Sequence, residues 1–308
     1  MNQTADLHIH SSISIDGETQ PEELVRRCAA RGISTIALTD HNSVRGIAPA
    51  KQAAMLYGVT VLSGIELDSI MDGIHLHILG YGIDETDPIF ADIESGILQQ
   101  ERYAGGLRIE LVRKCCRLQL DGAWLCKNAN HGVITGELIA EAALNDPENQ
   151  HNALIQPYLP GGSRSDNPYL NFYWDYCAPG KPAYVPIRYM HTQQAIEQIH
   201  ACGGAAVLAH PGAGVGITQN TIARLVPYGL DGIEVYSSYH TAQQTTMYAA
   251  IAKQYGLLST CGSDFHGRTK PSVALGETMC NHTSTLAVAL RQGIRDCSAK
   301  YARRLQPA

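Results

Sequence analysis

Two histidines one residue apart end the first apolar segment of the chain, in the run Asp6-Leu7-His8-Ile9-His10. This segment is predicted to be a strand, and successive side chains of a strand point to opposite faces. The imidazoles of His8 and His10 therefore project to the same side, within reach of one metal ion. Imidazole and carboxylate groups together are ligands of zinc, iron and manganese. The segment therefore predicts part of a metal site.

Further residues with metal-binding side chains stand at or just beyond short apolar runs. They are Asp16, His41, Glu66, His77, His210, Asp264 and His266. With His8 and His10 they exceed the needs of one ion, because a catalytic zinc takes about three protein ligands and a water. Two or three ions sharing a bridging carboxylate would use them all. Closely spaced ions are a common device for activating oxygen in phosphoryl transfer.

Other polar residues have simpler explanations. His75 shares a strand face with His77, and His77 is favoured because it lies nearer the C-terminal end of its strand. Asp40 is expected to orient the His41 imidazole rather than bind metal, and Asp68 is expected in a loop. Histidines that follow no strand are expected to be structural: His131, His151, His191, His200, His240 and His282.

The elements that position these residues alternate between strands and helices. Strands are expected at 6–10, 35–39, 59–65, 74–81, 205–209, 232–236 and 258–261. Helices are expected at 21–31, 43–57, 89–118, 192–201, 218–226 and 241–255. This repeat predicts a parallel sheet. Seven strands favour a closed or nearly closed α/β barrel, in which chemistry lies at the C-terminal strand ends.

Residues 121–189 interrupt the repeat. They are rich in proline and tyrosine and contain few strand signals. A segment this long without regular structure is usually functional. The sequence therefore predicts a barrel from residues 1–120 and 190–308, with 121–189 as an inserted lid or cap.

Composition limits the partners and the compartment. The formal net charge is −6, whereas proteins that bind long nucleic acids present a basic face. The chain has no apolar run of 18 residues and no visible signal peptide, so neither a membrane nor secretion is expected. Nine cysteines without CxxC spacing favour reduced thiols in the cytoplasm, although Cys115-Cys116 could be redox-active. The sequence leaves the oligomeric state open.

Taken together, the motifs resemble the PHP (polymerase and histidinol phosphatase) family of metal-dependent phosphoesterases. The matching blocks come in the family's order: 6–10 with 14–17, 39–42, 64–66, 77–81, 209–211 and 262–266. The resemblance implies a distorted seven-stranded (β/α)7 TIM-like barrel. This chain has Asp rather than His at position 16. In this respect it resembles the branch that acts on nucleotides or on small phosphodiesters, including cyclic ones, more than it resembles the histidinol phosphatases.

The resemblance also implies how the ligands are shared among two or three divalent ions of manganese, zinc or iron. One ion would be held by His8, His10, Glu66 and Asp264. A second would be held by Glu66, His77 and His210, and a third by Asp16, His41 and His266. Hydroxide activated by the metals would attack phosphorus. His210, or His41 and Asp264 as a pair, would provide acid–base catalysis.

The substrate is expected to be a small phosphate ester or phosphodiester, such as a phosphoribose cyclic phosphate. The alternative is a nucleotide phosphatase or a 3',5'-nucleotide or oligonucleotide phosphodiesterase. Relatives that trim oligonucleotides tend to carry an arginine soon after the histidine of the block at 209–211, where this chain has glycines. Candidate substrate contacts are Arg102, Arg108, Lys181 and Arg188.

Two other classes compete with a phosphoesterase. An amidohydrolase would usually carry a carbamylated lysine at a strand end, and the sequence shows no lysine there. A non-catalytic metal-binding module would be marked by loss of ligands, and all nine positions are filled.

Overall fold

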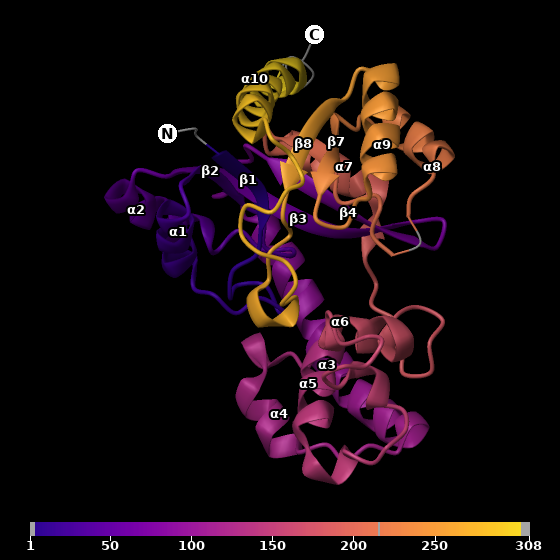
Figure 1. The fold of residues 1–308 in the computed structure, drawn as a ribbon. Helices are drawn as coiled ribbons and strands as arrows, with labels where there is room; N and C mark the ends of the chain where they lie inside the picture. Colours follow the sequence, from indigo (N-terminus) through magenta and orange to yellow (C-terminus); the bar gives the residue numbers. More distant parts are fainter. Residues whose placement is uncertain (1–3, 215, 303–308) are drawn as a thin grey trace.

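The computed structural model describes residues 4–214 and 216–302. Its centre is one sheet in which seven strands follow each other in the order β1-β2-β3-β4-β6-β7-β8, with the short β5 paired to β3 (Figure 1). The strands are β1 Thr4–Ile9, β2 Ile33–Leu38, β3 Thr60–Met71, β4 Ile74–Tyr81, β5 Met190–His191, β6 Ala205–Leu208, β7 Gly232–Ser237 and β8 Leu258–Gly262.

The two ends of this sheet approach each other. The amide of Asp264 donates to the carbonyl of His8 (2.8 Å), and the amide of His10 donates to the carbonyl of Phe265 (3.0 Å). These bonds join β1 to the segment after β8 and nearly close the barrel. The predicted seven-stranded, TIM-like barrel is therefore confirmed.

One strand departs from the predicted parallel arrangement. β4 runs antiparallel to both of its neighbours, β3 and β6. It follows β3 through a tight turn in which Asp72 and Gly73 both have positive φ values. The residues of β4 nearest the other motifs therefore belong to its N-terminal half, and the reason given for favouring His77 over His75, its closeness to the C-terminal strand end, was wrong.

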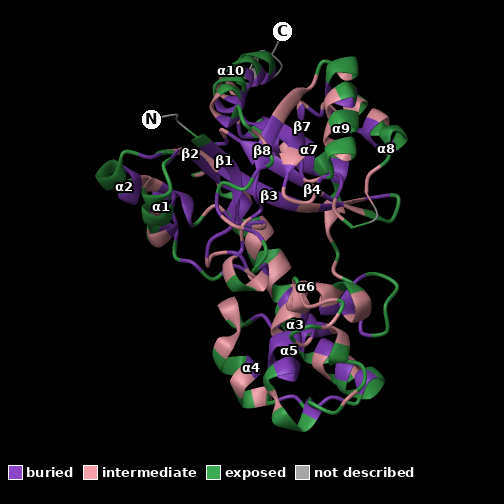
Figure 2. Ribbon diagram, viewed as in Figure 1, coloured by how far each residue is buried: buried purple, intermediate pink, exposed green. Residues whose placement is uncertain are grey.

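Helices cover the outside of the barrel, with green exposed faces and buried inner faces in Figure 2. Those of the barrel are α1 Pro21–Ala30, α2 Ile47–Tyr57, α7 Thr192–Ala201, α8 Gln219–Leu225, α9 Ala242–Tyr255 and α10 Thr283–Ala302. The α9 helix begins with a capping box between Thr241 and Gln244. No helix in the described part of the chain is long and apolar enough to span a membrane.

A second lobe is built from the insertion and has its own hydrophobic core. Its helices are α4 Gly122–Asn128, α5 Gly136–Asn145 and α6 Pro168–Phe172. The long α3 helix, Ile89–Cys116, joins the lobes: Phe90 packs in the barrel core and Val112 in the core of the insertion. The second core therefore begins within α3, ahead of residue 121.

Candidate metal centre

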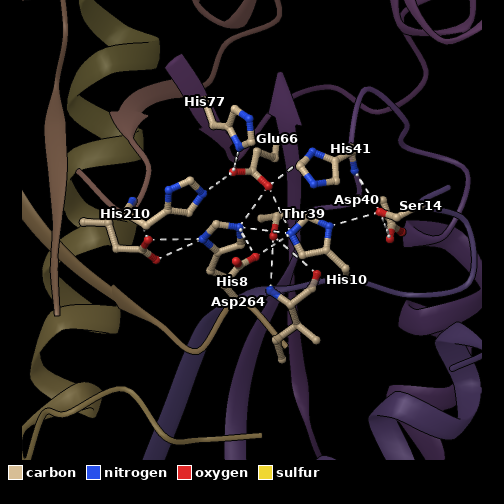
Figure 3. A network of polar contacts seen from close by, with 12 residues as sticks. His8, His10, Ser14, Thr39, Asp40, His41, Glu66, His77, His210 and Asp264 are labelled. Atoms are coloured by element: carbon tan, nitrogen blue, oxygen red, sulfur yellow. Dashed lines mark hydrogen bonds and ion pairs between the residues drawn. The ribbon is translucent and has the colours of Figure 1, made fainter. Parts of the chain in front are cut away.

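Imidazoles and carboxylates that are far apart in the sequence converge on Glu66 (Figure 3). The Nε2 atom of His10 lies 3.0 Å from Glu66 Oε2 and 3.0 Å from Asp264 Oδ1. The Nε2 atom of His8 lies 3.0 and 3.2 Å from the same two oxygens. Ligands about 2.0–2.1 Å from a tetrahedral ion are separated by about 3.3 Å. These four atoms are therefore spaced as one ion requires.

Glu66 divides its two oxygens between neighbouring groups. Its Oε2 faces His8 and His10, whereas its Oε1 lies 2.9 Å from His77 Nδ1 and 3.0 Å from His210 Nε2. Glu66 is fully buried on β3. It is placed to bridge two ions.

A third group lies beside the first. His266 Nε2 is 3.2 Å and His41 Nε2 is 4.0 Å from Asp16 Oδ2. The rings of His10 and His266 stack with their centroids 4.0 Å apart, so this group adjoins the first. Donor atoms of His10, His41 and His266 also lie within 4.8 Å of one another, and so do donor atoms of His8, Glu66, His210 and Asp264.

The polar atoms of this cluster fit a metal better than they fit each other. Four buried atoms have no hydrogen-bond partner among the described residues: Asp16 Oδ1, His41 Nδ1, Asp264 Oδ1 and His266 Nε2. A buried polar atom without a hydrogen-bond partner is costly, and metal ions bound within the cluster would offset that cost. Carboxylate oxygens and imidazole nitrogens are the donors that zinc, manganese and iron accept.

The electrostatics keep several carboxylates ionised. Burial alone would raise the pKa of Glu66, but the imidazoles of His8, His41 and His77 hold it well below its usual range. For Asp264, burial is outweighed by Lys270, His266 and His8, which also lower the pKa. Burial and the neighbouring His266 and His41 lower the pKa of His10 to about 4. Burial would lower the pKa of His8 and His77, but Glu66 and the other nearby carboxylates raise it, for His77 to about 9. Ionised carboxylates and neutral imidazoles are the forms that bind metal, so a bound ion would displace protons from these two rings.

Sequence reasoning missed Glu234, a fully buried residue in the apolar strand β7. Its carboxylate lies 3.1 Å from His8 Nδ1 and accepts the backbone N–H of His210 (2.8 Å). It therefore fixes the ring of one candidate ligand and the backbone of another. A carboxylate inside an apolar strand was the signal that could have revealed it.

Lys270 was also missed, because it stands in a loop beyond β8. It is buried, and its Nζ donates to Asp264 Oδ2 (2.6 Å), which also accepts the Tyr239 hydroxyl (2.6 Å). The two donors hold Oδ2 and leave Oδ1 facing His8 and His10. The ion pair also distinguishes Lys270 from the lysine of an amidohydrolase, which bridges metals through a carbamate.

Three secondary expectations need correction or completion. Asp40 does not orient the His41 ring: its oxygens accept from Ser11 and from the Ser14 hydroxyl, which also lies 3.0 Å from His10 Nδ1. Asp68 is not in a loop but on β3, 3.1 Å from His77 Nε2, because β3 is longer than predicted. His75 packs edge-on against Tyr189.

The candidate substrate residues lie in the insertion, on α3 or on the return to the barrel. Arg108 is buried, pairs with Glu101 (3.1 Å) and donates to the carbonyl of Ile134. Arg102 donates to the carbonyl of His131, and the backbone of Arg188 contacts Gln100. Lys181 is exposed. Two of the four side chains, those of Arg102 and Arg108, are thus engaged within the protein.

Comparison with known proteins agrees with this geometry. The PHP domain model matches residues 6–146. A 3',5'-nucleoside bisphosphate phosphatase of Chromobacterium violaceum is 33% identical over 97% of this chain and 98% of its own. The chain belongs to the PHP family. The resemblance drawn from the motifs is thereby confirmed.

Other PHP relatives differ in what they act on. A 5'-3' exoribonuclease of Haemophilus influenzae is 32% identical, covering 86% of this chain and 91% of its own. A phosphoribosyl 1,2-cyclic phosphate 1,2-diphosphodiesterase of Eggerthella lenta is 29% identical, with coverage of 85% and 94%. All three relatives are named for cleavage of a phosphate ester or phosphodiester bond.

Solved structures support the fold. One from Bifidobacterium adolescentis has a TM-score of 0.75 at 22% identity and covers 95% of this PHP chain and 97% of that one. Another, from Chromobacterium violaceum, has a TM-score of 0.68 at 30% identity, with coverage of 85% and 87%. The second is described as an amidohydrolase with bound sulfate and no metal.

Proposed function

We propose that this PHP chain is a metal-dependent phosphatase that removes a phosphate from a small nucleotide such as a nucleoside 3',5'-bisphosphate. The observation that carries the proposal is the cluster of nine donor residues, in which four buried atoms have no hydrogen-bond partner among the described residues. The bisphosphate phosphatase, related over nearly the full length of both chains, supports the choice of substrate.

The ions would be held by His8, His10, Glu66 and Asp264, by Glu66, His77 and His210, and by Asp16, His41 and His266. When bound, divalent ions supply positive charge to the phosphoryl oxygens and lower the pKa of a water. We propose manganese, zinc or iron, since mixed imidazole and carboxylate donors suit each of them.

The chain itself orients the ligands and sets the open side of the centre. The side chains of His8, His10 and Glu66 are fully buried, whereas those of His41, His77 and His210 are 13%, 31% and 15% exposed. The phosphate would approach over these three rings. Because the rings of His210 and His41 would be bound to metal, a group beside them would give the proton to the leaving oxygen. Asp264 is buried and would act as a metal ligand, held in place by Lys270 and Tyr239.

A second substrate class is a cyclic phosphodiester of phosphoribose, as named for the relative from Eggerthella lenta. The turn after His210 contains Gly212, Gly214 and Gly216 and no cation, which favours a compact substrate over an oligonucleotide. The insertion also docks against the loops at the centre, on the side of Asn130 and His131.

The free cysteines are consistent with a cytoplasmic location, which we propose as well.

The test is a substrate panel with the Mn²⁺-loaded protein. Nucleoside 3',5'-bisphosphates, ribose cyclic phosphates, 5'-phosphorylated oligonucleotides and an amide set are compared by released phosphate and by product analysis. We expect the highest kcat/KM for a bisphosphate or a cyclic phosphate. The phosphatase proposal would be contradicted if the fully metal-loaded protein hydrolysed only the amides, or if it hydrolysed none of the substrates.

A further inference from the structure

The insertion contacts the barrel at the loop that carries Asp16, residues 11–18. The Asn130 amide donates to the carbonyl of Gly17 (2.5 Å) and lies 3.5 Å from that of Ser14. The Nε2 atom of His131 lies 3.1 Å from the carbonyl of Ser12. Three backbone carbonyls on either side of Asp16 are therefore held by two adjacent side chains of the insertion.

The turn that presents these side chains has an uncommon backbone. His131 adopts a left-handed conformation (φ 52°), followed by Gly132 at φ 75°. Non-glycine residues rarely adopt this conformation and need surrounding contacts to keep it. The Nε of Arg102 donates to the carbonyl of His131 (2.8 Å) and anchors the turn to α3. The turn is therefore anchored both to the loop and to α3.

The insertion also holds the segment that carries His266. Arg268 pairs with Glu141 of α5 (2.9 Å), and the Ser272 hydroxyl contacts Asn167 Oδ1 (2.9 Å). Glu141 and Asn167 both belong to the insertion. The segment after β8 is thus attached to the second lobe at two points.

The two loops are in turn connected to each other. Arg268 Nε lies 3.0 Å from Glu18 Oε2, and the Thr269 hydroxyl donates to the carbonyl of Asp16 (2.8 Å). The Asp16 carboxylate itself has one oxygen near His266 and one without a hydrogen-bond partner among the described residues. Its position is therefore set through the backbone of its loop.

The other candidate ligands are positioned differently. His8, Glu66 and His77 lie on strands β1, β3 and β4, whose ladders place them. In contrast, Asp16 and His266 lie in loops that share hydrogen bonds with the insertion. A weakened contact between the lobes should therefore affect the group around Asp16 before the other two groups.

We infer that the insertion completes the metal site formed by Asp16, His41 and His266, and that occupancy of this site depends on the docked insertion. The inference rests on the proposed metal centre and goes beyond it, because it gives the insertion a positioning role that is separate from contact with substrate.

The test measures metal binding directly rather than turnover. Asn130→Ala and Glu141→Gln are made singly and together in the full chain, which is dialysed against a series of Mn²⁺ concentrations and assayed for bound metal. Asp16→Ala serves as the reference for a lost third site. We expect the double variant to bind one ion fewer than the wild type near saturation, or to bind that ion at least tenfold more weakly.

Matched controls separate docking from folding. Asn128→Ala removes an amide two residues away that donates within the insertion, to the carbonyl of Trp124 (2.8 Å). Arg164→Gln removes an ion pair with Asp175 inside the insertion. Both controls should retain the wild-type metal count. Circular dichroism and the melting temperature check that every variant folds.

The outcomes distinguish this inference from the proposed function. If Asp16→Ala loses one ion and the folded double variant loses none, the insertion does not complete the site, while the metal centre stands. If the wild type binds only two ions and Asp16→Ala binds the same two, there is no third site to complete and the inference is overturned. A wild type that binds no metal contradicts the proposed centre itself.

Discussion

Glu66 is the residue on which the centre depends most, because each of its oxygens faces a different pair of histidines. We expect Glu66→Gln to lower both metal content and kcat/KM by at least about a hundredfold, since an amide has one weak oxygen donor where the carboxylate has two charged ones. Metal analysis and phosphate release from the same preparation measure the effect.

Glu85→Gln is the matched control for that substitution. Glu85 pairs with Lys51 on the barrel surface, so its loss should leave the metal content and the turnover unchanged. A folded Glu66→Gln protein with a full metal complement and near wild-type turnover would refute the bridging role.

Glu234 tests whether orientation of a ligand matters at this site. Its carboxylate holds His8 Nδ1 and thereby directs Nε2 toward Glu66 and Asp264. Loss of such a partner typically costs about 10–100-fold in metal affinity. We expect Glu234→Gln to weaken Mn²⁺ binding by this amount in a calorimetric titration. An unchanged affinity would mean that the strand alone orients His8.

At the scale of residues, short motifs predicted the groups that converge, since each candidate ligand follows an apolar run. They did not reveal the groups that orient the ligands. Glu234 is surrounded by apolar residues of its strand, and Lys270 reaches Asp264 from a loop six residues further along the chain. Such partners are chosen by tertiary contact, which leaves no fixed spacing in the sequence.

At the scale of elements, most strands and helices could be predicted because hydrophobic periodicity and end signals agree. The direction of β4 could not be predicted from its alternating pattern, which is the same for parallel and antiparallel pairing. The signal was Asp72-Gly73 between two strands, which favours a type I′ hairpin. Both residues have φ values typical of that turn, 52° and 79°.

Gly73 therefore gives a prediction about the hairpin. A Cβ there would meet no neighbouring atom, so Gly73→Ala tests only the left-handed backbone. We expect a loss of about 1–2 kcal/mol in the free energy of unfolding, seen as a lower melting temperature. Gly96→Ala on α3 is the control, because it also meets open space but has a helical backbone, and should be stabilising. Equal effects of the two substitutions would exclude backbone strain as the cause.

The first turn of α5 gives a prediction about pH. Burial and the nearby Asp16 raise the pKa of Glu137 to about 7, from 4.5 in the unfolded chain. Between these values the folded protein binds more protons than the unfolded one, so stability falls as pH rises from 4.5 through 7. The loss is about 3 kcal/mol at most.

Glu137→Gln removes this titration. Without added metal, the variant should lose less stability than the wild type between pH 5 and pH 8, as measured by urea unfolding midpoints. Parallel pH profiles for the two proteins would show that Glu137 keeps an ordinary pKa in the fold.

At the scale of the whole molecule, the two lobes have separate cores but meet at the loops of the metal centre. An ion that binds only the folded state stabilises it by about 2.7 kcal/mol when its concentration is a hundred times the dissociation constant. Binding that holds the barrel loops in contact with the insertion should also oppose separation of the lobes. We therefore expect calorimetry in Mn²⁺ to show a higher melting temperature and a single transition.

Chelation should reverse both effects. With EDTA we expect a lower melting temperature and a broader or divided transition, since metal then no longer holds the barrel loops that contact the insertion. Glu66→Gln should melt alike in Mn²⁺ and EDTA, which ties the shift to the centre rather than to ions on the surface. If EDTA lowers the melting temperature but leaves one sharp transition, the lobes are coupled by their protein contacts alone, because metal would then add stability without joining them.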